Sequence, residues 1–259
     1  MTPCCGLRCT FAIFRWKCSR AAHSRRHSRS PSPPALRPGL HTIARDAAKE
    51  HATLARIAAW SLQFTSLVNI AESGGILLEI EGSLKLFGGL GKLYQHIAHG
   101  VAGLGFNAGM ACAPTPLAAL WFARAGMNVR LQHQDALRHA LEKLPVDLLC
   151  EDSATRNLLE SFGARTLGDC LKLPRDGLAR RAGTRLLDQL DRALGQCPDL
   201  RLPFVAPQTY SAALPLPAPV ANAEALLFAT RRLLAELCGW LAATGHGVQR
   251  PKFEFIHEK

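Results

Sequence analysis

Two acidic side chains, Glu79 and Glu81, are the first residues whose type and spacing could do chemistry. Residues two apart on a strand point to the same face, so the pair could clasp a divalent cation. An exposed strand face explains the same pattern without a ligand. His96 and His99, three apart in an expected helix, are also metal-ligand candidates. No Cys or carboxylate stands at a matching spacing, which favours solvent-facing histidines.

The nine cysteines form no recognisable motif. Four of them, Cys4, Cys5, Cys9 and Cys18, lie near the amino terminus, and no Cys-x-x-Cys pair occurs. A zinc site from these four remains an alternative, although their spacing fits no common ligand pattern. An odd count of scattered cysteines favours reduced thiols over a disulfide framework. We therefore predict neither a metal nor a cofactor.

The net charge of +11 is concentrated at one end of the chain. Residues 1–45 contain nine Arg or Lys and no Asp or Glu, so the remainder is close to neutral. We expect residues 1–40, rich in Arg, Ser and Pro, to be a disordered basic tail. Their lack of acids resembles a mitochondrial transit peptide, but a solvated basic arm or a misassigned start codon is favoured.

The hydrophobic content of 48% is enough for a real core and excludes disorder throughout. No run reaches the roughly 18 apolar, uncharged residues of a membrane span. We expect a soluble, cytoplasmic protein.

Hydrophobic spacing predicts an α/β arrangement over residues 41–135. A helix is expected from Asp46, a strand at Ile76–Ile80 and a second helix over residues 90–99. Thr115 suits a helix N-cap with Pro116 in the first turn, and Gly126 suits the end of that helix. A short strand is expected at residues 128–132.

Residues 136–198 are expected to be purely helical. The helices at 153–162 and 184–194 are separated by tight turns, and Thr166 with Asp169 forms a capping-box pattern. Small helices joined at glycines are typical of a helix-hairpin-helix unit, whose backbone N–H groups can hold phosphates. A Pro-rich linker, 199–208, then leads to an incomplete β-α-β unit over 209–259, with strands at 210–214 and 248–256 and a helix at 223–243.

Four stretches together resemble the Y-family (UmuC/DinB-type) translesion DNA polymerases, most closely the ImuB group. They are Leu77–Gly89, Gly109–Gly126, Leu158–Gly195 and Leu216–Leu237. The resemblance covers residues 45–259 and implies a multidomain α+β fold. That fold comprises a partial palm, a helix-hairpin-helix-like thumb and an incomplete little finger, in a member shortened at both ends.

The resemblance also implies two-metal nucleotidyl transfer, which needs carboxylates on adjacent palm strands. The positions of the family's acidic pair fall on Gly74 and Gly75. A first palm strand, the source of another ligand, is not recognisable in residues 1–45, and neither is a fingers domain. Active relatives tend to have Lys where this chain has Pro116 and Leu120. A protein without polymerase activity is therefore expected.

DNA-backbone contacts are expected in the thumb-like segment, around its helix starts and turns. A merely solvated face is the alternative, because acidic residues lie among these positions and the family's Gly-x-Gly hairpin is absent near residues 150–153. The candidate residues are Arg165, Lys172, Arg175, Arg180, Arg181, Arg185, Gly163 and Gly168.

Three functions remain open. The leading one is an accessory factor of damage-induced mutagenesis that binds primer-template DNA without reading its sequence. The resemblance implies a sliding clamp, an ImuA-type protein and an error-prone replicative-type polymerase as its partners. The others are a low-fidelity Y-family polymerase and a truncated, non-functional gene product.

Overall fold

The computed structural model describes residues 10–15, 46–150, 152–216, 220 and 222–256. Within these ranges no helix combines the length and apolarity needed to cross a membrane. Three expectations concern residues outside these ranges. They are the alternative of a zinc site at the first four cysteines, the disordered tail apart from residues 10–15, and the missing fingers domain.

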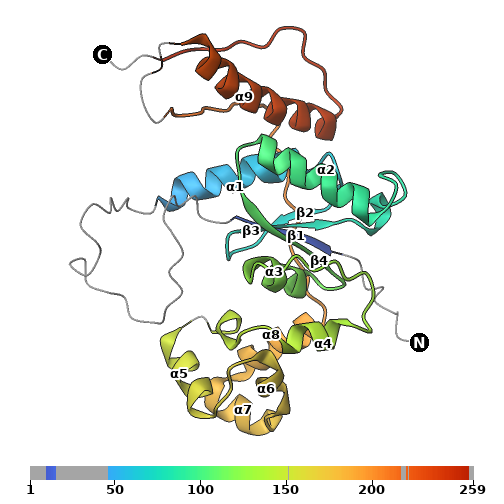
Figure 1. Cartoon of the computed structure of the whole chain (residues 1–259), viewed down its shortest axis with the longest axis vertical. Helices are drawn as coiled ribbons and strands as arrows, with labels where there is room; N and C mark the ends of the chain where they lie inside the picture. The colour runs from blue at the N-terminus through green and yellow to red at the C-terminus, as the bar shows by residue number, and fades with distance from the viewer. Residues whose placement is uncertain (1–9, 16–45, 151, 217–219, 221, 257–259) are drawn as a thin grey trace, which may run out of the picture.

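A four-stranded antiparallel sheet lies at the centre of the molecule, in the order β2-β3-β1-β4 (Figure 1). Its strands are β1 (Thr10–Arg15), β2 (Val68–Ile70), β3 (Gly75–Glu79) and β4 (Ala108–Ala113). The strand expected near Ile76 is confirmed.

Strand β1 corrects the expectation of a continuous disordered tail and of a missing first strand. It pairs on both sides, with Phe11 opposite Leu78 of β3 and opposite Cys112 of β4. Six residues between basic flanks carry a weak local signal, and the two neighbouring strands supply the hydrogen bonds that order them.

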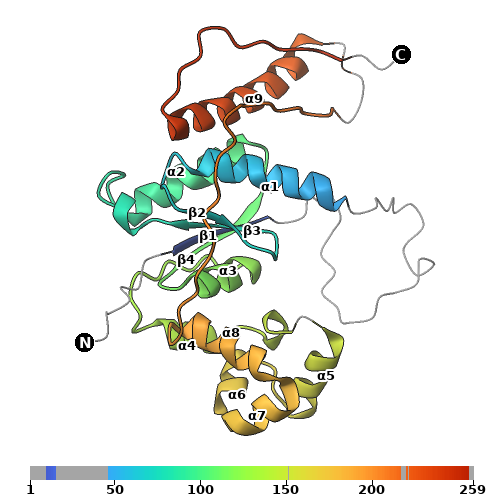
Figure 2. The same ribbon diagram turned by 180° about the vertical axis from the view of Figure 1, so that it is seen from behind.

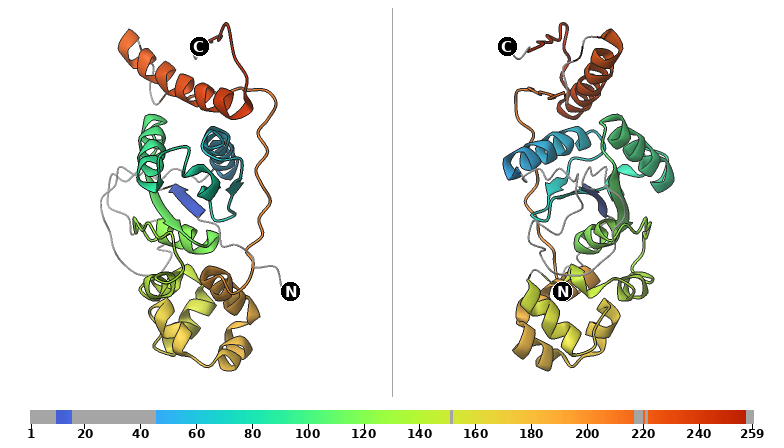
Figure 3. Two further views of the ribbon diagram at one scale, coloured as in Figure 1. Left: turned by 90° about the vertical axis from the view of Figure 1, so that its right-hand side faces the viewer. Right: turned by 60° about the vertical axis from the view of Figure 1, so that its left-hand side comes forward.

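Helices cover both faces of the sheet (Figure 3). Helices α1 (Ala47–Ser61) and α2 (Leu90–Gly103) lie on one face, where they share a core with Ile76 and Leu78. Helix α3 (Pro116–Arg124) lies on the other face, in the core that contains Leu77. Successive side chains of β3 thus point into two different cores, which explains why this strand is almost entirely apolar. The strand expected at residues 128–132 is reduced to one bridge, between Arg130 and Cys112.

A helical unit follows the sheet and lies on the α3 side (Figures 1 and 2). It comprises α4 (Leu137–Glu142), η3 (Val146–Leu148), α5 (Ser153–Ser161), α6 (Leu167–Lys172), α7 (Arg175–Ala182) and α8 (Thr184–Leu194). The capping box at α6 is confirmed, since the Thr166 hydroxyl accepts from the Asp169 N–H and Asp169 accepts from the Thr166 N–H. The unit shares its core with α3.

The chain then crosses the edge of the sheet to helix α9 (Ala223–Thr244), which lies over α1 (Figure 2). On the way, the Phe204 N–H donates to the Val68 carbonyl at 2.6 Å. The helix is confirmed, but the strands expected at 210–214 and 248–256 are wrong, because neither segment pairs with a strand of the described chain. The Tyr210 side chain packs against Trp240 instead.

Candidate nucleic-acid interface and the strand ends of the sheet

The two glycines at the expected acidic positions lie where β3 begins. Gly75 is buried and stands in register with Phe14 of β1. Gly74 closes the β2–β3 turn: its N–H donates to the Ala71 carbonyl at 2.9 Å, and the Ala71 N–H donates to the Gly75 carbonyl at 2.8 Å. The φ angle of Gly74 is +85°, a conformation that favours glycine. The turn therefore explains Gly74 on conformational grounds.

Glu79 and Glu81 do not share a strand face as expected. Strand β3 ends at Glu79, and Glu81 begins the short 3-10 helix η2 (Glu81–Ser83). The Glu79 carboxylate accepts a hydrogen bond from the Glu81 N–H at 3.0 Å. Both residues line an open cleft of about 870 Å³ between the sheet, the start of α3 and residues 195–203. The Glu79 carboxylate thus stabilises the turn that follows β3, and it does not form a pair of metal ligands with Glu81.

The two histidines behave as predicted. His96 and His99 are exposed on α2, and His96 lies edge-on to Phe87 with ring centroids 6.1 Å apart. Among the residues that the structure describes, no three His, Cys, Asp or Glu side chains are grouped to hold a metal.

Helix α3 begins as the sequence predicts. Thr115 is its N-cap, with a hydroxyl that accepts from the Ala118 N–H, and Pro116 occupies the first turn. Leu120 is only 4% exposed and belongs to the core. A long cationic side chain at that position would have to displace this packing.

The six basic candidates are all exposed, and Arg175 and Lys172 lie beside carboxylates. Arg175 makes a double hydrogen bond to Asp191, at 3.0 and 2.7 Å, which raises the pKa of its guanidinium. Lys172 lies 3.9 Å from Asp169. The acids were visible in the sequence, but Arg175 and Asp191 are sixteen positions apart, so their pairing has no sequence signal.

The start of α6 is satisfied by the chain itself. The backbone N–H groups of Arg165 and Thr166 both donate to the Asp169 carboxylate, which lowers the pKa of that group. Gly168 is buried, and a β-carbon there would lie 3.0 Å from the Glu142 carbonyl. Gly168 is therefore packed against α4 and cannot contact a phosphate. Gly163 is exposed at a left-handed turn, with φ +75°.

The remaining arginines gather where α7 meets α8. Arg180 and Arg181 end α7, Arg185 lies in the first turn of α8, and exposed Gly183 joins the two helices. The Arg181 guanidinium also lies 5.3 Å from the centre of the Phe162 ring. We call Arg180, Arg181 and Arg185 the α7–α8 arginines.

The thiols of the helical unit are not activated. Burial raises the pKa of Cys170 to about 11 and also raises that of Cys150. Because the thiolate is the reactive form, nucleophilic chemistry at these residues is disfavoured.

Comparison with known proteins finds a relative of this sequence. The chain is 31% identical to Protein ImuB from two strains of Caulobacter vibrioides over 226 residues, or 87% of this chain. It spans 49% of that relative's length. No known protein-family profile matches the chain. The motifs and this identity make the chain a relative of the Y-family polymerases. Within that family the chain is an ImuB-like member.

Solved structures give weaker likenesses. A DinB-family error-prone DNA polymerase from Sulfolobus solfataricus has a TM-score of 0.49 at 14% identity, covering 74% of this chain and 68% of that one. An insertion ternary complex of Dbh DNA polymerase also has a TM-score of 0.49, at 16% identity over 60% of this chain and 47% of that one.

Proposed function

We propose that this ImuB-like chain is a catalytically inactive accessory factor of translesion synthesis. In this role it binds DNA through its helical unit and helps another polymerase to act at a lesion. The observation that carries the proposal is the pair Gly74 and Gly75 at the start of β3, where the family resemblance requires an acidic pair.

Strand β1 supports the same proposal. It lies beside β3, where a first palm strand would contribute a further metal ligand, but its sequence TFAIFR contains no Asp or Glu. Two-metal phosphoryl transfer needs carboxylates on adjacent strands. Glycine, phenylalanine and alanine can neither hold a divalent cation nor move a proton.

We assign roles to the segments on this basis. Residues 41–135 together with β1 form the palm-like part, and residues 136–198 form the thumb-like part. Residues 199–208 are a linker, and residues 209–259 form the little-finger-like part. A sliding clamp, an ImuA-type protein and an error-prone replicative-type polymerase are the proposed partners, because the ImuB-like sequence implies them.

The α7–α8 arginines are the proposed backbone contacts to DNA. They are three exposed cations within six residues, on both sides of the exposed turn at Gly183. Such contacts read phosphate charge and carry no base specificity. Arg165, Lys172 and Arg175 are further candidates, and the Asp169 and Asp191 carboxylates lie beside Lys172 and Arg175.

Primer extension tests the absence of catalysis. Purified protein with Mg²⁺ or Mn²⁺ should add no nucleotide to a primed template. Glu79→Gln is the matched control, since it removes the half-buried carboxylate at the other end of β3. Template-dependent extension that survives in Glu79→Gln would overturn the proposal.

A salt titration of duplex binding tests the DNA contact. The combined variant Arg180→Ala, Arg181→Ala, Arg185→Ala should lower the slope of log affinity against log salt by about 0.9 for each phosphate that these side chains neutralise. The control replaces three exposed cations elsewhere, Lys49, Lys92 and Arg231, by Ala. Equal slopes for the two variants would assign the DNA contact to another surface.

A further inference from the structure

The cleft at the end of β3 lies on the α3 face of the sheet, beside the start of that helix. Asn69 of β2 is in register with Leu77 of β3, and Thr10 of β1 is in register with Glu79. Because Leu77 belongs to the core that contains α3, all four side chains point to this face. The volume of about 870 Å³ is typical of ligand sites. Polar side chains thus line a space that is large enough for a ligand.

Two hydrogen-bond acceptors in this cleft are open to a further donor. The Asn69 side-chain amide donates from Nδ2 to the Leu202 carbonyl at 2.5 Å, and its Oδ1 is buried with no donor in the described part of the chain. The half-buried Glu79 carboxylate uses Oε1 to accept from the Glu81 N–H, which leaves Oε2. A buried acceptor without a donor is costly, so a ligand that donates to it gains affinity.

The charges around the cleft favour one cation. Arg201 and Asp199 pair with each other at 2.8 Å in the wall formed by the connecting segment. Glu79 and Glu81 therefore give the sheet side a negative charge, which repels the phosphates of DNA. Exposed Arg192 lies in the last turn of α8, on the other side of the cleft, and disfavours a run of basic residues.

The apolar part of the lining favours a cation on an aliphatic stem. Leu67 and Leu200 line the cleft and are 39% and 93% exposed. An arginine side chain matches this combination, because its planar fork can donate to a carboxylate and to an amide oxygen together, while its methylene groups cover apolar surface. A lysine ammonium has fewer donors and lacks the fork.

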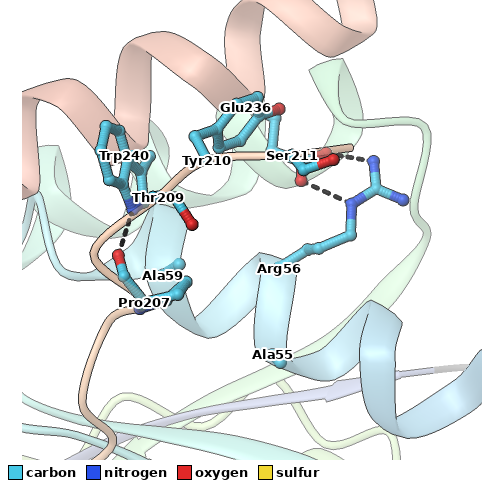
Figure 4. A pocket seen from close by; sticks show the side chains of 9 residues that line it. All are labelled: Ala55, Arg56, Ala59, Pro207, Thr209, Tyr210, Ser211, Glu236 and Trp240. Atoms are coloured by element: carbon cyan, nitrogen blue, oxygen red, sulfur yellow. Dashed lines mark hydrogen bonds and ion pairs between the residues drawn. The ribbon is translucent and has the colours of Figure 1, made fainter. Parts of the chain in front are cut away.

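The wall formed by residues 195–203 is fixed before any ligand binds. The hydrogen bond to β2 described above holds one end of this wall. Further along the chain, the Trp240 indole N–H donates to the Pro207 carbonyl at 3.2 Å, and Arg56 pairs with Glu236 and also donates to the Ala213 carbonyl (Figure 4). A ligand therefore meets a preformed cleft and does not have to order this wall.

We propose that this cleft docks an extended segment of a partner protein that carries one arginine beside an apolar residue. The guanidinium donates to the Glu79 carboxylate and to Asn69 Oδ1, and the apolar neighbour packs on Leu67 and Leu200. The inference rests on the proposed accessory role, because such a factor acts through protein partners. The site is separate from the α7–α8 arginines, so DNA and the partner can bind together.

Selection from a phage-displayed library of random short peptides on the full-length chain tests the proposal. Enriched peptides should contain a single arginine next to an apolar residue. The variant Glu79→Gln should lose this preference, although its side-chain oxygen can still accept from the Glu81 N–H and so preserve the turn. Glu72→Gln is the matched control, because Glu72 is exposed in the turn at the opposite end of β3.

A synthetic copy of the most enriched peptide gives the affinity by fluorescence anisotropy. Glu79→Gln, or citrulline in place of the peptide arginine, should weaken binding by about tenfold, and Glu72→Gln should leave it unchanged. Peptides without arginine, runs of basic residues or no enrichment at all would overturn the proposal. So would equal binding by Glu79→Gln and the wild type. Neither result alters primer extension, so the accessory role is judged separately.

Discussion

The Thr115 hydroxyl joins the sheet to the helical unit by donating a hydrogen bond to the Ala193 carbonyl at 2.7 Å. The same oxygen accepts from the Ala118 N–H and so caps α3. Thr115 is 2% exposed, and Gln134 supports the junction by donating from its side-chain amide to the Leu194 carbonyl at 2.7 Å. One side chain therefore starts a helix of the first unit and satisfies the end of a helix of the second.

Replacing Thr115 by Val should destabilise the protein by about 2 kcal/mol. Removal of the N-cap costs about 1 kcal/mol, and the orphaned Ala193 carbonyl costs about another. Thr115→Ser keeps both hydrogen bonds and should be destabilised much less. Urea unfolding of the three proteins measures the difference, and equal stabilities of the Val and Ser variants would contradict the role of the hydroxyl.

An acidic pair placed at Gly74 and Gly75 should not produce polymerase activity. In Gly74→Asp the left-handed backbone penalises the new side chain by about 1 kcal/mol, and in Gly75→Glu an unpaired carboxylate enters a buried position. With no acid on β1, primer extension by the double variant should remain at background. Gly74→Asn should be better tolerated, because Asn adopts this conformation more readily. Nucleotide addition by the double variant would show that the site needs only those two residues.

The sequence predicts the capped helices well and the sheet only in part. Helix ends can be predicted from local chemistry that needs no distant partner, as at Thr115, Thr166 and Gly126. Strand β1 has no such local signal, because its order comes from pairing with residues about sixty or more positions away. The same argument explains Glu236, which reads as one acid in an apolar helix until Arg56 is beside it.

Acid should weaken three helix starts together. Asp46 and Asp152 cap α1 and α5, and Asp169 completes the capping box of α6. Hydrogen bonds from backbone N–H groups hold the pKa of each below its ordinary value of 3.8. A lowered folded-state pKa gives stability that is present above pH 3.8 and disappears as the pH falls through the folded value. Urea unfolding from about pH 6 to about pH 3, with Asp→Asn at all three sites as the comparison, should show a shallower decline in the variant. If the stability of the wild type and of the variant declined equally with falling pH, the groups responsible for acid sensitivity would lie elsewhere.

The basic amino-terminal segment should account for most of the DNA affinity measured in vitro. Residues 1–45 contain nine cations and no acids, and phosphate neutralisation dominates non-specific binding. Deleting this region would also remove β1 and so damage the sheet. The better variant replaces Arg20, Arg25, Arg26, Arg29 and Arg37 by Gln, which leaves β1 intact.

The expected result is a lower slope of log affinity against log salt on duplex DNA, by about 0.9 for each phosphate that these arginines neutralise, with no change in sequence preference. Replacing Ser19, Ser24, Ser28, Ser30 and Ser32 by Gln is the control, because it alters the same segment without altering its charge. If both variants bind like the wild type, the segment is not the main source of affinity. The α7–α8 arginines would then be expected to carry the binding, and the slope of their combined variant would decide it.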